Sequence, residues 1–367
     1  MAQGTSDEST ILRIVRLELS QVSGTEAPAR SSIVTCALDQ RTLDMLESIP
    51  EFSAYEAPNT DDAPYCITRS LDLAAGLGMF AQEDLDMGDL ILAERPLAVI
   101  PAFVLGGSSK SDPEELFDQL TALMDQHARS TFFALADCHQ GPCHALGIFK
   151  TNGIGLGDDL VYPDDSSDPT YVGVFNHASR INHSCSPNAV YHFDLQSFCL
   201  EVRAIRPIPK GEEIFISYSD SLLRPAKRRQ RSLHNYEFCC TCSACANADI
   251  SDERRASIKS VPSIDLRASP EVIIAISGEQ VRLLELEGLQ MLGQHVEHAL
   301  FLVVAHTALE DSSDAAVYEE KVRRWEIAIR GDRANFDNIE LAKQAGLRIA
   351  AARTNDVTIS ERSTART

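Results

Sequence analysis

The sequence predicts an α+β fold with a β-rich centre and a helical C-terminal part. Residues 172–218 contain short strand-like runs separated by turns, and the runs at 189–193 and 198–204 enclose a four-residue turn, the signature of a β-hairpin. Farther along the chain, residues 279–304 and 315–329 carry apolar side chains at helical spacing. The 367 residues can bury a full core, as one large domain with appendages or as two to three smaller units.

The composition indicates a globular protein with an acidic surface. The formal net charge is −21, which disfavours direct binding to nucleic acids and favours basic protein partners. A merely solubilising acidic surface is the alternative interpretation. The longest apolar run, near residues 299–305, is too short to span a bilayer, and no apolar leader opens the sequence. We therefore expect an intracellular protein of the nucleus or cytoplasm, with no membrane association.

The first 60 residues carry no motif. Residues 11–17 alternate in a way that can form a strand if another element covers it, and residues 59–64 are typical of a loop. A poorly ordered or accessory N-terminal extension is expected.

A helical insertion is predicted after residue 105. Asp112 is a suitable N-cap, Pro113 fits the first helical position, and apolar residues follow at a spacing of three to four. Two cysteines and two histidines crowd into residues 138–144, but four ligands within seven residues rarely converge on one ion. A turn with incidental thiols is favoured there over a metal site.

Three later stretches are informative together. They are RINHSCSPN at residues 180–188, GEEIFISY at residues 211–218, and FCCTCSAC at residues 238–245. In this order and at these separations they resemble the SET-domain lysine methyltransferases, over roughly residues 66–245. The nearest branch is similar to fungal SET proteins related to the SET-and-MYND group. The paired CxxC ligands of a MYND finger are absent from residues 105–148, so only a helical insert is expected there.

The resemblance implies an S-adenosylmethionine-dependent transfer of methyl groups to the lysine side-chain amine of a protein, either a histone tail or another basic protein. Tyr218, at the end of a strand-like run, occupies the position of the family's catalytic tyrosine. The cofactor contacts that the resemblance implies come from Gly76, Leu77, Gly78, Asn152, Asn182, His183, Tyr218 and Phe238. A non-catalytic SET scaffold that recruits partners at chromatin is the competing hypothesis.

The cysteines of the third stretch suggest a zinc site. In a reducing compartment, clustered cysteines point to metal ligation more than to disulfides. Cys240, Cys242 and Cys245 supply three thiolates, whereas structural Zn²⁺ takes four ligands. In the resembled family Cys185 provides the fourth. Cys239 is then spare, although a ligand shift from Cys240 to Cys239 stays open.

With the resemblance, the expected architecture is a β-rich SET domain with a helical insertion, a zinc-bound post-SET knuckle and a C-terminal helical domain. The expected divisions are an extension (1–60), the two halves of the SET domain (61–104 and 149–221) around the insertion (105–148), the knuckle (222–247), the helical domain (262–350) and a frayed tail (351–367).

Overall fold

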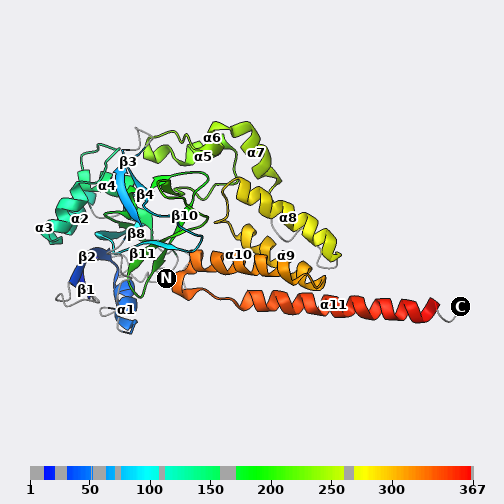
Figure 1. The fold of residues 1–367 in the computed structure, drawn as a ribbon. Coiled ribbons are helices and arrows are strands. Elements are labelled where there is room, and N and C mark those ends of the chain that lie inside the picture. Colours follow the sequence, from blue (N-terminus) through cyan, green and yellow to red (C-terminus); the bar gives the residue numbers. More distant parts are fainter. Residues whose placement is uncertain are drawn as a thin grey trace, which may run out of the picture.

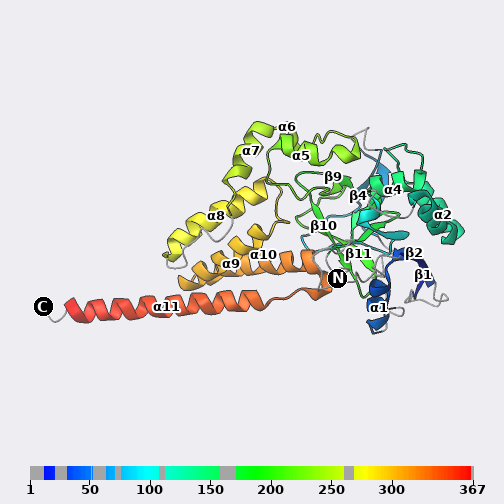
Figure 2. The same cartoon turned by 180° about the vertical axis from the view of Figure 1, so that it is seen from behind.

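The computed structural model describes residues 12–20, 31–50, 52, 63–70, 76–106, 112–157, 171–259 and 268–364, with backbone only for 20, 31 and 354–364. The predicted α+β fold is confirmed: three small β-sheets form the centre, and helices flank them on two sides (Figure 1). Helices α2 to α4 lie on one side of the sheets, and α8 to α10 lie on the other (Figure 2). Among the described helices, none is both long and apolar enough to cross a membrane.

The strands form sheets of five, four and three members. The five-stranded sheet has the order β1 (Arg13–Ser20), β2 (Ser31–Leu38), β6 (Ala98–Pro101), β8 (Tyr171–Val174) and β7 (Ile154–Gly155). The four-stranded sheet has the order β3 (Tyr65–Arg69), β4 (Leu77–Ala81), β12 (Glu213–Ile216) and β9 (Asn182–His183). The three-stranded sheet has the order β10 (Ala189–Asp194), β11 (Cys199–Ala204) and β5 (Leu90–Glu94).

The N-terminal segment is more structured than the sequence led us to expect. Strands β1 and β2 pair along their whole length, β2 continues in parallel onto β6, and helix α1 (Gln40–Ser48) follows. Buried Val34, Cys36 and Leu38 join the main core. The reason is tertiary: β2 supplies the partner strand that the alternating run in β1 needs, and β6 joins this pair to the rest of the sheet. The loop expected at residues 59–64 lies largely outside the described residues.

The helical insertion begins where the sequence predicts. Asp112 caps α2 (Pro113–Leu123) by accepting from the backbone N–H of Glu114, and Pro113 is its first residue. Helices α3 (Gln126–Phe133) and α4 (His144–Asn152) follow, and the three helices share an apolar core with β6 and β8. Helix α4 runs past residue 148, where the insertion was expected to end. Within the described residues, the cysteines and histidines at 138–144 are not among the groups of side chains that could hold a metal ion.

The predicted hairpin is confirmed. Strands β10 and β11 pair in antiparallel register from Ala189 opposite Ala204 to Asp194 opposite Cys199. The backbone N–H of Ser197 donates to the Asp194 carboxylate at 2.8 Å, and Phe198 takes a left-handed conformation to close the turn. This hairpin follows directly after the RINHSCSPN stretch.

Several short helices connect these elements. They are η2 (Ala102–Val104), η4 (Ala178–Arg180), α5 (Ala226–Ser232), η5 (His234–Tyr236), α6 (Ser243–Ala246), α7 (Ala248–Ser257) and η7 (Gly331–Arg333).

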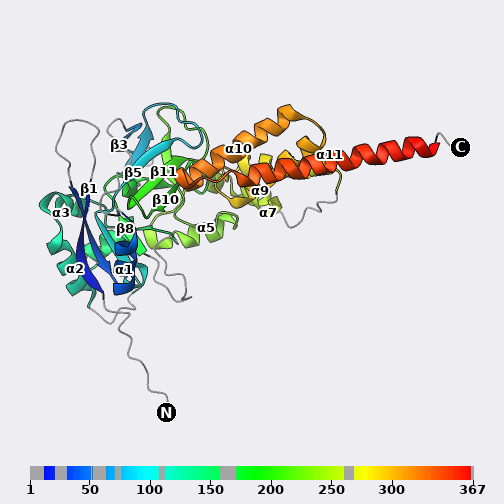
Figure 3. The same ribbon diagram turned by 90° about the horizontal axis from the view of Figure 1, so that it is seen from below.

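The C-terminal helices are α8 (Pro270–Leu286), α9 (Gly293–Ala308), α10 (Ser312–Arg330) and α11 (Asp337–Thr364). The segment predicted as one helical pattern at 279–304 is two helices, because Gly288 adopts a φ of +64°. A Cβ on Gly288 would lie 2.9 Å from that of Ser186, so the break also lets the helices approach the RINHSCSPN loop. Helix α11 continues through Thr364, beyond the expected start of the tail at residue 351, and extends away from the sheets (Figure 3).

Candidate active site

The RINHSCSPN and GEEIFISY stretches lie side by side. Strand β9 runs parallel to β12, with Asn182 opposite Phe215 and His183 opposite Ile216. Asn188, which is fully buried, accepts from the backbone N–H of Phe215 at 2.7 Å and donates to the backbone oxygen of Glu213 at 2.8 Å. The last asparagine of the loop therefore fixes the loop to the strand that leads to Tyr218.

Tyr218 lies at the junction of several elements. Its hydroxyl donates to the backbone oxygen of Ile181 at 2.6 Å, and its backbone N–H donates to Nδ1 of His183 at 2.9 Å. Its ring centroid is 5.3 Å from that of His183, 4.9 Å from that of Tyr236 and 6.5 Å from that of Phe238. Burial raises the pKa of Tyr218, so the hydroxyl stays protonated and keeps its lone pairs as acceptors.

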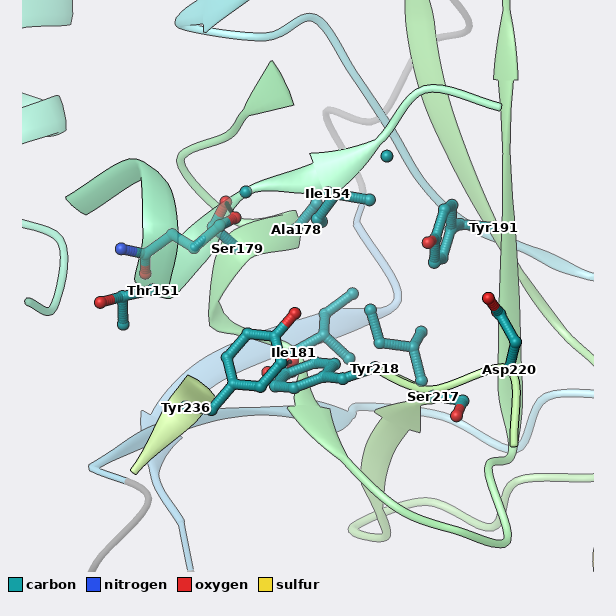
Figure 4. Close-up of a pocket in the computed structure, with 14 residues that line it drawn as sticks. Thr151, Ile154, Ala178, Ser179, Ile181, Tyr191, Ser217, Tyr218, Asp220 and Tyr236 are labelled. Atoms are coloured by element: carbon teal, nitrogen blue, oxygen red, sulfur yellow. Dashed lines mark hydrogen bonds between the residues drawn. The ribbon is translucent and has the colours of Figure 1, made fainter. Parts of the chain in front are cut away.

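A cavity of about 220 Å³ opens beside Tyr218. Tyr191, Asp220 and Tyr236 form part of its wall, and Figure 4 shows their polar ends pointing toward the same space. Within the described part of the chain, none of these three polar ends has a hydrogen-bond partner, so they are available to a ligand. Burial raises the pKa of Tyr191 to about 12, with smaller contributions from the nearby Tyr236 and Asp220, so this hydroxyl stays protonated.

Sequence reasoning missed these three residues. Asp220 and Tyr236 lie two positions from Tyr218 and Phe238, which is the only signal that could have drawn attention to them. Tyr191 comes from β10 and carries no local signal.

The residues expected to bind the cofactor fall into separate groups. Asn152 and Tyr218 line the cavity, whereas Gly76, Leu77, Gly78, Asn182, His183 and Phe238 are not among its lining residues. Gly76 has a φ of +74°, which suits glycine, and Asn182 donates to the backbone oxygen of Leu77 at 3.1 Å. The ring centroids of His183 and Phe238 are 6.1 Å apart, and both rings contact the ring of Tyr218.

The side chain of Asn152 already has partners. Its Nδ2 donates to the backbone oxygens of Ala136 and Ile148, both at 2.7 Å, and its own backbone oxygen accepts from Ser179 at 2.9 Å. Both amide hydrogens are thus used to close the end of α4. Only Oδ1 of this side chain is left for a ligand.

Four cysteine thiols meet beneath this site. The sulfur atoms of Cys185, Cys240, Cys242 and Cys245 all lie within 4.8 Å of one another. The Sγ of Cys185 is 3.6 Å from that of Cys245 and 4.0 Å from that of Cys240. Zinc–sulfur bonds of about 2.3 Å in a tetrahedron place sulfur atoms about 3.8 Å apart, so the four thiols could hold a metal ion. Cys239 is exposed and outside the cluster.

His183 connects the thiol cluster to Tyr218. Its Nε2 lies 3.4 Å from the sulfur of Cys185, and its Nδ1 accepts from the backbone of Tyr218. Burial lowers the pKa of His183 to about 4, so the ring is neutral at physiological pH.

Sequence comparisons match part of this chain to known proteins. The family model for the SET domain matches residues 76–219. The histone-lysine N-methyltransferase set5 of Schizosaccharomyces pombe is 31% identical over 188 residues, which cover 49% of this chain and 52% of that protein. The protein-lysine N-trimethyltransferase SMYD5 of Homo sapiens is 44% identical over 81 residues, covering 21% of this chain and 19% of that protein.

Among solved structures, the Neurospora SET domain protein DIM-5, a histone lysine methyltransferase, is 22% identical. The match covers 43% of this chain and 53% of that one, with a TM-score of 0.26. The chain matches about half the length of set5 and about a fifth of the length of SMYD5.

Proposed function

The chain carries a SET domain over residues 76–219, and from this premise we propose that it transfers methyl groups from S-adenosylmethionine to a lysine amine of a protein substrate. The observation that carries the proposal is the position of Tyr218. It lies two residues after the end of β12, contacts His183 in the neighbouring stretch, and borders a cavity with unpaired polar groups. These groups suit an amine that must be held in one orientation.

The residues present fit such a cofactor. Asn182 uses both amide hydrogens within the chain and so offers Oδ1 as an acceptor for an ammonium group. The rings of His183 and Phe238 provide a surface for an adenine. The bound cofactor would supply an electrophilic methyl group on a sulfonium.

The chain's own part in the reaction is alignment and control of a proton. A lysine amine has a free pKa of about 10.4 and must be neutral to attack. The negative charge of Asp220 attracts the ammonium form toward the cavity, and burial then favours the neutral amine, whose proton leaves to solvent before methyl transfer. The protonated hydroxyl of Tyr218, anchored on Ile181, turns its lone pairs toward the reacting groups. Alignment of two reactants contributes about 7–11 kcal/mol in well-oriented models.

The thiols of Cys185, Cys240, Cys242 and Cys245 would hold one structural Zn²⁺. Their mutual distances support this assignment, and Cys240 is the ligand in preference to Cys239. The metal would tie the loop at Cys185 to the segment after Tyr236, so both walls of the site would depend on it.

A basic protein is the proposed substrate. The relatives named above are histone-lysine and protein-lysine methyltransferases, and a net charge of −21 attracts a histone tail or another basic segment. With such a substrate, the protein would act in the nucleus or in the cytoplasm. The competing scaffold hypothesis is not favoured, because Asn182, Tyr218 and the four thiols are all retained in one chain.

The test compares the wild type with Tyr218→Phe. Both proteins, at equal zinc content, are incubated with labelled S-adenosylmethionine, histones and a lysate. Loss of the hydroxyl leaves ring packing and cofactor binding in place, so methyl incorporation should fall steeply while cofactor affinity is kept. Equal incorporation by both proteins would remove Tyr218 from the chemistry. Absence of S-adenosylmethionine binding by the wild type would contradict the proposed function itself.

A further inference from the structure

The side-chain amide of Asn182 is fixed by two acceptors. Its Nδ2 donates to the backbone oxygen of Leu77 at 3.1 Å and to Oε1 of Glu213 at 2.7 Å. An amide nitrogen carries two hydrogens, so both are used. Because both neighbours are acceptors, only the nitrogen can face them, and Oδ1 must face away. Within the described residues, Oδ1 has no hydrogen-bond partner.

Glu213 is itself held in place. The residue is 6% exposed at the start of β12, and its Oε2 accepts from the hydroxyl of Ser70 at 2.9 Å. Its two oxygens are therefore committed to Ser70 on one side and Asn182 on the other. In the described part of the chain, no cationic side chain forms an ion pair with it. A buried carboxylate without a cation is costly, which favours a positively charged ligand nearby.

The Glu213 carboxylate occupies the space where a side chain at residue 78 would lie. A Cβ at Gly78 would clash with Oε1 of Glu213 and would lie 3.0 Å from Nδ2 of Asn182. The Glu213 side chain could move away only by breaking its bonds to Ser70 and Asn182. The glycine is thus required by the carboxylate and not by the backbone conformation, because Gly78 has no positive φ.

We infer that Glu213 is a positioning residue of the cofactor site: it fixes the amide of Asn182 so that Oδ1 accepts from the ammonium group of S-adenosylmethionine. Gly78 is glycine because any side chain there displaces the carboxylate. This inference rests on the proposed function. The second glutamate of GEEIFISY thereby takes part in cofactor binding, and glycine is needed at residue 78 because a side chain there would clash with this glutamate.

The experiment measures binding by calorimetry with two ligands. S-adenosylmethionine carries the ammonium group, and 5′-methylthioadenosine keeps the adenosine but lacks the amino-acid part. The variants are Glu213→Ala, Glu213→Gln and Gly78→Ala. Glu212→Gln is the matched control, because its carboxylate bonds Asn188 and Arg206 and does not touch Asn182.

Glu213→Ala and Gly78→Ala should bind S-adenosylmethionine about 10- to 100-fold more weakly, the effect of losing one hydrogen bond to a charged group. Both should bind 5′-methylthioadenosine as the wild type does. Glutamine at 213 can still accept from Asn182, so Glu213→Gln should show a smaller loss. Glu212→Gln should match the wild type with both ligands.

Two results would overturn the inference alone: wild-type affinity of Gly78→Ala for S-adenosylmethionine, or an equal loss for both ligands, which would indicate general damage to the site. Zinc content and far-ultraviolet circular dichroism, measured on each variant, check that the fold is retained. A wild type that binds neither ligand would refute both the proposed function and this inference, so the two failures are distinguishable.

Discussion

Replacing Arg255 with methionine should lower the free energy of unfolding by about 3 kcal/mol. Arg255 is 1% exposed and lies in α7. Its guanidinium donates to the Glu287 carboxylate at 2.9 Å, to the backbone oxygen of Leu222 at 2.7 Å and to the hydroxyl of Ser186 at 3.0 Å. One side chain therefore joins the RINHSCSPN loop, the segment after Tyr218 and the end of α8.

The magnitude follows from what the substitution leaves behind. Breaking a buried ion pair by removing one partner costs about 3–5 kcal/mol, because the remaining charge stays buried without compensation. Glu287 keeps Arg254 at 3.4 Å and the hydroxyl of Ser251 at 2.5 Å. These remaining partners bring the expected cost to the lower end of that range.

The assay is urea denaturation at pH 7 in a buffer containing zinc. The matched control is Arg282→Met, which removes an exposed pair with Glu279 at 2.7 Å and should lower the free energy of unfolding far less than Arg255→Met does, because solvent screens the pair. The double variant Arg255→Met with Glu287→Leu should be more stable than Arg255→Met alone, because no buried charge is left unpaired. The reasoning would be refuted if Arg255→Met were no less stable than the Arg282→Met control.

Three further results are expected. Cys242→Ser should lose the one bound zinc per chain, measured by metal analysis after preparation without chelator; full metal content in the variant would contradict the ligand set. Asp220→Asn should raise KM for a lysine substrate more than it lowers cofactor affinity, and an unchanged KM would remove Asp220 from the amine site. Burial raises the pKa of Glu285, but its bonds to His295 and Lys321 outweigh burial and lower that pKa to about 2. Because the folded pKa is below the ordinary 4.5, the stabilisation by Glu285 is complete above about pH 4.5 and is lost as the pH falls toward about 2. The difference in unfolding free energy between the wild type and Glu285→Gln should therefore shrink over this pH window. A difference that stayed constant would contradict the assignment.

The sequence by itself determined the features that depend on neighbouring residues. The start of α2 at Asp112 and the β10–β11 hairpin could be predicted because a cap and a turn are local interactions. The fold class and the SET domain could be recognised because three short stretches kept their order and composition. The assignments of Tyr218 and Asn182 came from that resemblance and remain proposals.

Only the tertiary structure decided which distant residues meet. The pairing of β2 with β6 covers an N-terminal segment that has no motif of its own. Tyr191 and Asp220 face one cavity from separate elements, and Glu213 reaches Asn182 across 31 positions of the chain. Such contacts depend on how strands and loops pack. The residues next to a side chain in the sequence do not indicate which distant residue will contact it in the folded protein.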